Sequence, residues 1–116
     1  MLVIDLERAK VTLNETWNEM LGSWTKTLLK YMYGKDVNVV ANLNEEDAKT
    51  QFVVRGKYKD VKAYAKAVAA EKEFLDAYRE FGDNHPQTAK KRQELRADVS
   101  DFEMVTGLTW PFKDED

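Results

Sequence analysis

Apolar residues recur at helical spacing through the first part of the chain. Eight steps lead from Leu2 to Tyr31, so the mean step is close to the 3.6 residues of an α-helical turn. We expect one helix from about Asp5 to Tyr33, with Asp5 capping its first turn and Gly34 ending it. Three aromatic residues lie on its apolar stripe, where we expect them to contact the core or a protein partner: Trp17, Trp24 and Tyr31.

After Gly34 the helical period is lost. Valines and asparagines in the next stretch are typical of a loop or a short strand, and pairing with residues 51–55 would give a short β-hairpin near residues 37–55. The alternative is a helix that begins at Asn44, because the acidic residues after it suit the positive end of a helix dipole. We favour the helix and expect Gly56 to break or kink it.

Four apolar residues recur at intervals of seven positions. This seven-residue series predicts a long amphipathic helix with a coiled-coil-like seam that ends before Gly82. After a short turn, Pro86 is suited to open a second helix, which we expect to run to about Thr106 and to stop at Gly107. Because the turn is short, the two helices must run antiparallel. The members of the series are Val54, Val61, Val68 and Leu75.

These elements predict an all-α fold. We expect one helical domain over residues 1–107, in which the long N-terminal helix packs on the antiparallel hairpin as a three-helix bundle. Residues 108–116 form a tail that Pro111 prevents from continuing as a helix, and we expect Trp110 and Phe112 to anchor it. A helix from Asn44 to Phe81 would be about 57 Å long, which favours self-association or a partner alongside it.

Composition narrows the possible functions. The 116 residues suit one domain, and the absence of cysteine excludes a disulfide framework, a zinc-thiolate site and a thiol nucleophile. No apolar run is longer than the four residues 67–70, far fewer than the roughly 20 residues of a membrane span. A net charge of −3 is neither strongly basic nor strongly acidic. We therefore expect a cytoplasmic protein without membrane contact, a cofactor or a metal site.

The near-balanced charge is arranged in blocks. The net charge is +4 in residues 51–70, −3 in 71–84, +2 in 85–100 and −4 in 101–116. Closing the hairpin places opposite blocks side by side, and the pairs would select its register at about 0–1 kcal/mol each. The expected pairs are Asp76 with Arg92, Glu71 or Glu73 with Arg96, Lys66 with Asp101 or Glu103, and Lys57 or Lys59 with residues 114–116.

A basic stripe with tyrosines between its lysines is a candidate nucleic-acid site. Such a pattern can follow a phosphate backbone while the aromatic rings stack on bases. The alternative is that the stripe faces the acidic end of the hairpin, and the charge blocks favour this alternative. The stripe consists of Lys57, Lys59, Lys62 and Lys66.

Catalytic signals are weak. His85 is the only histidine, and its position beside Pro86 in a turn at the tip of the hairpin does not suit a catalytic cleft. Two pairs of carboxylates, Glu45 with Glu46 and Glu73 with Asp76, lie far apart in the sequence. Their layout resembles that of all-α nucleotide pyrophosphatases, in which paired helices present acids to Mg²⁺, although Lys49 stands where a further carboxylate belongs.

We therefore expect a non-enzymatic helical protein that binds a protein partner or assembles into oligomers. The first alternative is a nucleic-acid-associated accessory protein that uses the basic stripe, and the second is a Mg²⁺-dependent nucleotide hydrolase. A small cysteine-free helical chain would also suit a phage or plasmid accessory protein, although no motif points to one. The residues expected to contact a protein partner are Trp17, Trp24, Tyr31, Trp110 and Phe112.

Overall fold

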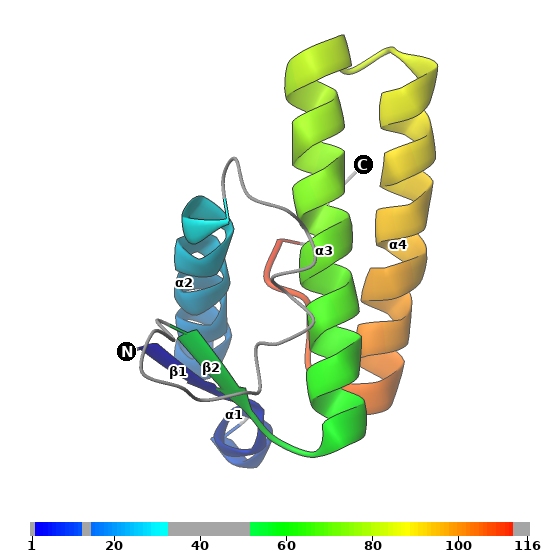
Figure 1. The fold of residues 1–116 in the computed structure, drawn as a ribbon. Coiled ribbons are helices and arrows are strands. Elements are labelled where there is room, and N and C mark those ends of the chain that lie inside the picture. Colours follow the sequence, from blue (N-terminus) through cyan, green and yellow to red (C-terminus); the bar gives the residue numbers. More distant parts are fainter. Residues whose placement is uncertain (1, 13–14, 33–51, 113–116) are drawn as a thin grey trace.

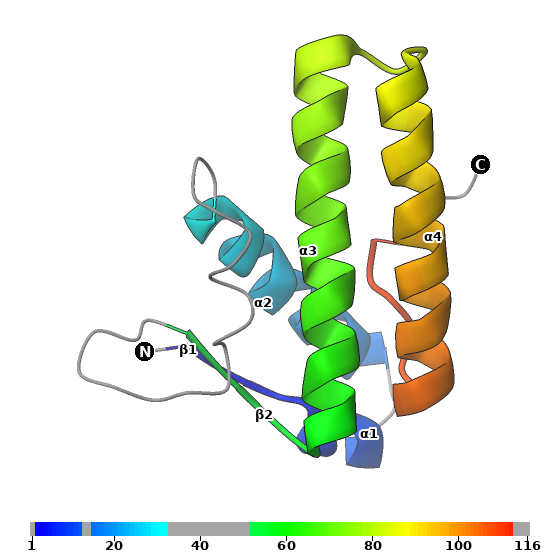
Figure 2. The same cartoon turned by 45° about the vertical axis from the view of Figure 1, so that its right-hand side comes forward.

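The computed structural model describes residues 2–12, 15–32 and 52–112, and most of these residues are helical. The two longest helices, α3 and α4, form the predicted antiparallel hairpin (Figure 1). In Figure 1, helix α2 and a small sheet lie beside α3, away from α4, and Figure 2 shows that α2 passes behind α3. The elements are β1 (Leu2–Asp5), α1 (Leu6–Thr12), α2 (Glu15–Tyr31), β2 (Phe52–Arg55), α3 (Tyr58–Phe81) and α4 (Pro86–Thr106).

The first and fourth elements form a two-stranded parallel sheet. Leu2 lies opposite Phe52, and Asp5 lies opposite Arg55. Each strand carries a continuous apolar run, which is typical of strands covered on both faces. The single N-terminal helix expected from residue 5 is therefore wrong, because the chain begins with a strand and then forms two helices.

The helix predicted from Asn44 through Phe81 is also wrong over residues 52–55, which form β2. These residues pair with β1 in parallel, not with the preceding residues in a β-hairpin. Whether residues 37–51 hold a strand or a helix lies outside the described residues. Val54, the first member of the seven-residue series, belongs to β2, so the series does not follow one helix.

Gly56 separates β2 from α3. Its φ of 154° lies in the region that favours glycine, and a Cβ at this position would lie 3.3 Å from the Cβ of Leu6. Helix α3 then begins at Tyr58 and has 24 residues, which corresponds to about 36 Å. The argument for a partner from a helix of about 57 Å therefore does not apply.

Local chemistry sets both ends of the hairpin turn. Gly82 ends α3 with a positive φ of 86°, and Pro86 opens α4. The His85 side chain caps α4 by accepting a hydrogen bond from the N–H of Gln87 at 3.0 Å. Thr88 Oγ1 donates to the carbonyl of Gly82 at 2.7 Å, which holds the first turn of α4 against the end of α3. These contacts explain why the sequence predicts the hairpin correctly.

The charged pairs across the hairpin differ from those expected. Glu73 faces Lys91 at 3.5 Å instead of Arg96, and Arg92 pairs with Asp83 instead of Asp76. Exposed pairs are too weak to set a register against the packing of the turn, so they form wherever the packed helices bring opposite charges together. Opposite charges do face each other across the hairpin, as Glu73 and Lys91 do, but the predicted partners of Arg92 and Arg96 are wrong. The predicted pairing of Lys57 or Lys59 with residues 114–116 lies outside the described residues.

The core lies where α3 meets α2, the sheet and the C-terminal tail. Tyr64 is fully buried at its centre, and its hydroxyl is 2.7 Å from Thr25 Oγ1. Thr25 donates to the carbonyl of Leu21, so the Tyr64 hydroxyl donates to Thr25. Burial raises the pKa of the Tyr64 hydroxyl well above its usual value. Other fully buried side chains are Ile4, Leu6, Leu28, Val68 and Phe102.

Candidate functional site

The C-terminal tail runs back along α4 (Figure 2), and its residues contact α2, α3 and α4. Trp110 donates from its indole Nε1 to Glu71 Oε1 of α3 at 3.1 Å and from its backbone N–H to Glu103 Oε2 of α4 at 2.8 Å. Pro111 lies against α2, since a Cβ at Gly22 would be 3.2 Å from the Pro111 Cβ. These contacts place the next residue, Phe112, beside α3, where it lines two hollows of the surface.

The first hollow, of about 660 Å³, lies between α2 and α3. Its apolar lining comes from Leu29, Leu75 and Phe112. Basic side chains from both helices border this apolar lining: Lys26, Lys30, Lys72 and Arg79.

The second hollow, of about 500 Å³, lies between α3 and α4. Two arginines of α4, Arg92 and Arg96, border it. Glu71 and Phe112 line both hollows, so the two adjoin, and we call them together the Phe112 groove. The apolar lining of the second hollow comes from Phe74, Leu95, Val99, Trp110 and Phe112.

The Phe112 groove is basic on a chain that is acidic. Six basic and three acidic residues line it among the described residues, which gives a net charge of +3 against −3 for the whole chain. Two of the three acids, Glu71 and Glu103, accept hydrogen bonds from Trp110, and the third, Asp76, pairs with Lys72 at 2.8 Å.

No protein-family model, curated protein or solved structure matches this chain. The size and lining of the Phe112 groove indicate what kind of molecule it could accommodate. Its hollows fall within the roughly 300–1,000 Å³ that is typical of ligand sites. An apolar floor with a basic border suits a ligand that is both apolar and acidic.

The aromatic residues expected to contact a partner lie in different surroundings. Trp110 is only 1% exposed and forms part of the groove floor, whereas Phe112 is half-buried between the hollows. Trp24 and Tyr31 are half-buried, and the Tyr31 ring lies 4.7 Å from the Phe52 ring, centroid to centroid. Only the position of Trp17 in α2 is described, and its side chain lies outside the described set.

The basic stripe is exposed. Lys57, Lys59 and Lys62 make no ion pair with another described residue. The partners expected for Lys57 or Lys59, residues 114–116, lie outside the described part of the chain. Lys66 is exposed and acts electrostatically on Asp98, and it makes no ion pair with the predicted partners Asp101 and Glu103.

Acidic residues border the stripe at its Lys66 end. Partial burial, with a contribution from the nearby Asp101 and Glu94, raises the pKa of the Asp98 carboxyl, and Lys66 opposes this rise. A phosphate backbone that approached Lys66 would meet the negative charges of this acidic cluster.

The predicted pyrophosphatase-like carboxylates are not assembled in the part of the chain that the structure describes. Glu73 pairs with Lys91 and Asp76 with Lys72, while Glu45 and Glu46 lie outside that part. No group of three His, Cys, Asp or Glu residues that could hold a metal ion occurs within residues 2–12, 15–32 and 52–112. Nor is any helix in these ranges long and apolar enough to cross a membrane.

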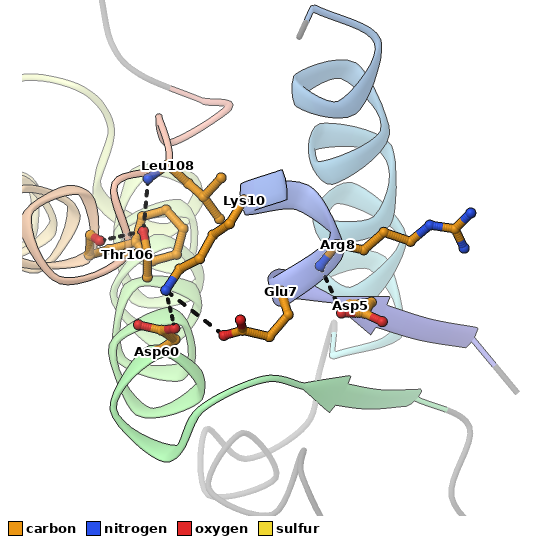
Figure 3. A network of polar contacts seen from close by, with 8 residues as sticks. Asp5, Glu7, Arg8, Lys10, Asp60, Thr106 and Leu108 are labelled. Atoms are coloured by element: carbon orange, nitrogen blue, oxygen red, sulfur yellow. Dashed lines mark hydrogen bonds and ion pairs between the residues drawn. The ribbon is translucent and has the colours of Figure 1, made fainter. Parts of the chain in front are cut away.

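A partly buried ion pair that the sequence did not indicate joins α1 to the first turn of α3 (Figure 3). Lys10 Nζ donates to Asp60 Oδ2 at 2.5 Å, and Asp60 is completely buried. Glu7 Oε1 lies 3.9 Å from the same ammonium group. In the described structure, Glu7 Oε1 and Asp60 Oδ1 are buried without a hydrogen-bond partner. The cluster links residues 50 positions apart, so local sequence patterns carry no signal for it.

Proposed function

We propose that the protein is a non-enzymatic interaction module that binds a segment of a protein partner in the Phe112 groove. The observation that carries this proposal is the open apolar lining of the groove, to which Leu75, Leu95 and Phe112 contribute half-buried side chains. Aromatic and arginine residues are enriched where proteins bind each other, and the groove contains both. A partner that covered these side chains would remove further apolar surface from water.

We also propose that α2, α3 and α4 pack together as a three-helix bundle, in which α2 takes the place of the longer N-terminal helix expected from the sequence. The support is the tail, which contacts Gly22 of α2, Glu71 of α3 and Glu103 of α4. This arrangement would hold both sides of the groove at a fixed separation. A second copy of the chain would also supply such a segment, so the assembly into oligomers predicted from the sequence stays part of the proposal.

The proposal predicts that peptides selected on the full chain depend on the groove for binding. Random peptides displayed on phage would be selected against the wild-type protein, and the affinities of individual peptides would be measured by fluorescence anisotropy. We expect Leu75→Glu, which places a charge in the apolar floor, to weaken binding at least about tenfold. Circular dichroism would first establish that the variant is folded.

The matched control is Lys62→Glu, an exposed charge change on the same helix outside the groove. Peptides should bind this variant as tightly as the wild-type protein. If no peptide is selected, or if the selected peptides bind Leu75→Glu unchanged, the proposal is contradicted.

The exposed lysines favour nucleic-acid binding as a second candidate function. Lys59 and Lys62 are solvent-exposed on one helix face, and Tyr58 beside them is 73% exposed and free to stack on a base. The acidic residues near Lys66 place this candidate second.

We expect any such binding to weaken steeply with salt and to be lost in Lys59→Glu/Lys62→Glu. A labelled single-stranded oligonucleotide at about 50 mM salt is the measurement, and absence of binding there would eliminate the candidate.

A further inference from the structure

Three cations that form no ion pair with another described residue lie around the Phe112 groove, on both of its sides. Lys26 and Lys30 of α2 border one hollow, and Arg96 of α4 borders the other. All three are exposed, and none makes an ion pair with another described residue. Lys26 and Lys30 are four residues apart, so they project from the same face of α2 about 6 Å apart along the helix.

The acidic residues of the groove already have partners. Glu71 and Glu103 accept hydrogen bonds from Trp110, which anchors the tail. Asp76, whose side chain is about half exposed, forms an ion pair with Lys72. A ligand would therefore meet a net positive surface without having to displace these contacts. Because the whole chain carries a net charge of −3, this positive surface does not simply reflect composition.

The shape of the groove determines how a ligand must distribute its charge. Phe112 lies between the two hollows, so apolar groups on the ligand must pack along it and into the spaces beside Leu75 and Leu95. The cations lie outside this apolar centre, on opposite sides. A ligand that satisfies both conditions carries an apolar stripe with acidic groups on each flank.

An amphipathic helix has this distribution when acidic residues flank its apolar stripe, as the e and g positions flank a and d in a coiled coil. Helices also commonly bind in apolar grooves through residues at i, i+3 or i+4, and i+7. A nucleic acid could satisfy the cations, but its phosphates gain nothing from Leu29, Leu75 or Leu95.

We infer that the partner segment is an acidic amphipathic helix that lies across Phe112, with its carboxylates facing Lys26 and Lys30 on one side and Arg96 on the other. This inference rests on the proposed function, because it names the chemistry of the segment bound in the Phe112 groove. The charge asymmetry of the groove then selects the partner, while the apolar floor supplies the contact area.

Three synthetic peptides of about 20 residues, each about 30 Å long as a helix, test the inference on the full chain. The first carries leucine at the a and d positions of each heptad and glutamate at e and g. The second replaces those glutamates by lysine, and the third has the composition of the first in scrambled order. We expect the glutamate peptide to bind at least about tenfold more tightly than either of the others, and less tightly as salt rises.

Two variants locate the contacts. Lys26→Glu/Lys30→Glu and Arg96→Glu should each weaken the glutamate peptide about tenfold and strengthen the lysine peptide. Lys59→Glu/Lys62→Glu, with two equivalent charge changes outside the groove, should leave both affinities unchanged. Equal binding of the glutamate and lysine peptides, or equal effects of the groove and control variants, would overturn the inference.

The outcomes separate this inference from the proposed function. If the peptides selected by phage display depend on Leu75 but are neutral or basic, the groove binds protein segments and the inference is wrong. If no selected peptide depends on Leu75, the proposed function itself fails. If an oligonucleotide displaces the glutamate peptide and loses its own binding in Lys26→Glu/Lys30→Glu, the groove binds nucleic acid, and the inference is overturned.

Discussion

Replacing Trp110 by alanine should lower the free energy of unfolding by about 3–5 kcal/mol, the usual cost of removing a large buried aromatic side chain. Trp110 is 1% exposed, and its ring lies 5.2 Å from the ring of Phe102 and 6.0 Å from that of Tyr64, centroid to centroid. The substitution also leaves Glu71, which is 6% exposed, without the indole donor. Urea unfolding followed by circular dichroism measures the change.

Two controls separate the contributions of Trp110. Trp110→Phe keeps most of the ring but loses the N–H donor to Glu71, so we expect it to cost about 1–3 kcal/mol. Met104→Ala removes an 80% exposed side chain of the neighbouring helix and should change stability by no more than about 0.5 kcal/mol. If Trp110→Ala is no more destabilising than Met104→Ala, the tail does not hold the three helices together.

Replacing Lys10 by methionine should cost about 3 kcal/mol, because it leaves the buried carboxylate of Asp60 without its ion-pair partner. We take the lower end of the usual range because the Lys10 side chain remains 24% exposed and water can reach part of it. Thermal and urea unfolding of the full chain measure the loss.

The double variant Lys10→Met/Asp60→Leu gives the sharper test of this pair. Removing both charges leaves no unpaired buried ion, so we expect the double variant to be more stable than Lys10→Met alone. Glu7→Gln, which changes the more distant carboxylate, should have a smaller effect than Lys10→Met. Asp60→Leu alone completes the comparison. If the losses of stability in Lys10→Met and Asp60→Leu simply add up to the loss in the double variant, Lys10 and Asp60 do not interact energetically.

The hairpin could be predicted from the sequence because local chemistry determines its ends. Gly82 and Gly107 adopt positive φ values that favour glycine, and Pro86 fits the first position of a helix. The parallel sheet could not be predicted, because it depends on pairing between Leu2 and Phe52, which are far apart in the sequence. Its apolar runs are too short to distinguish a strand from a buried helix.

The candidate site was only partly predictable. Trp110 and Phe112 stood out as the anchors of the tail, and the structure buries Trp110 and places Phe112 in the groove. The hollows arise because the tail crosses three helices, and nothing local to the tail encodes that path. Lys26 and Lys30 resemble ordinary solvated residues of an amphipathic helix until the structure places an apolar floor beside them.

The most direct test of the account is an NMR titration of the ¹⁵N-labelled full chain with the glutamate peptide. We predict that the backbone amide signals of Lys30, Leu75 and Leu95 shift together, while those of Lys59 and Lys62 stay in place. If only the signals of Lys59 and Lys62 shift, or if no signal shifts at saturating peptide, the claim that the Phe112 groove is the binding site is contradicted.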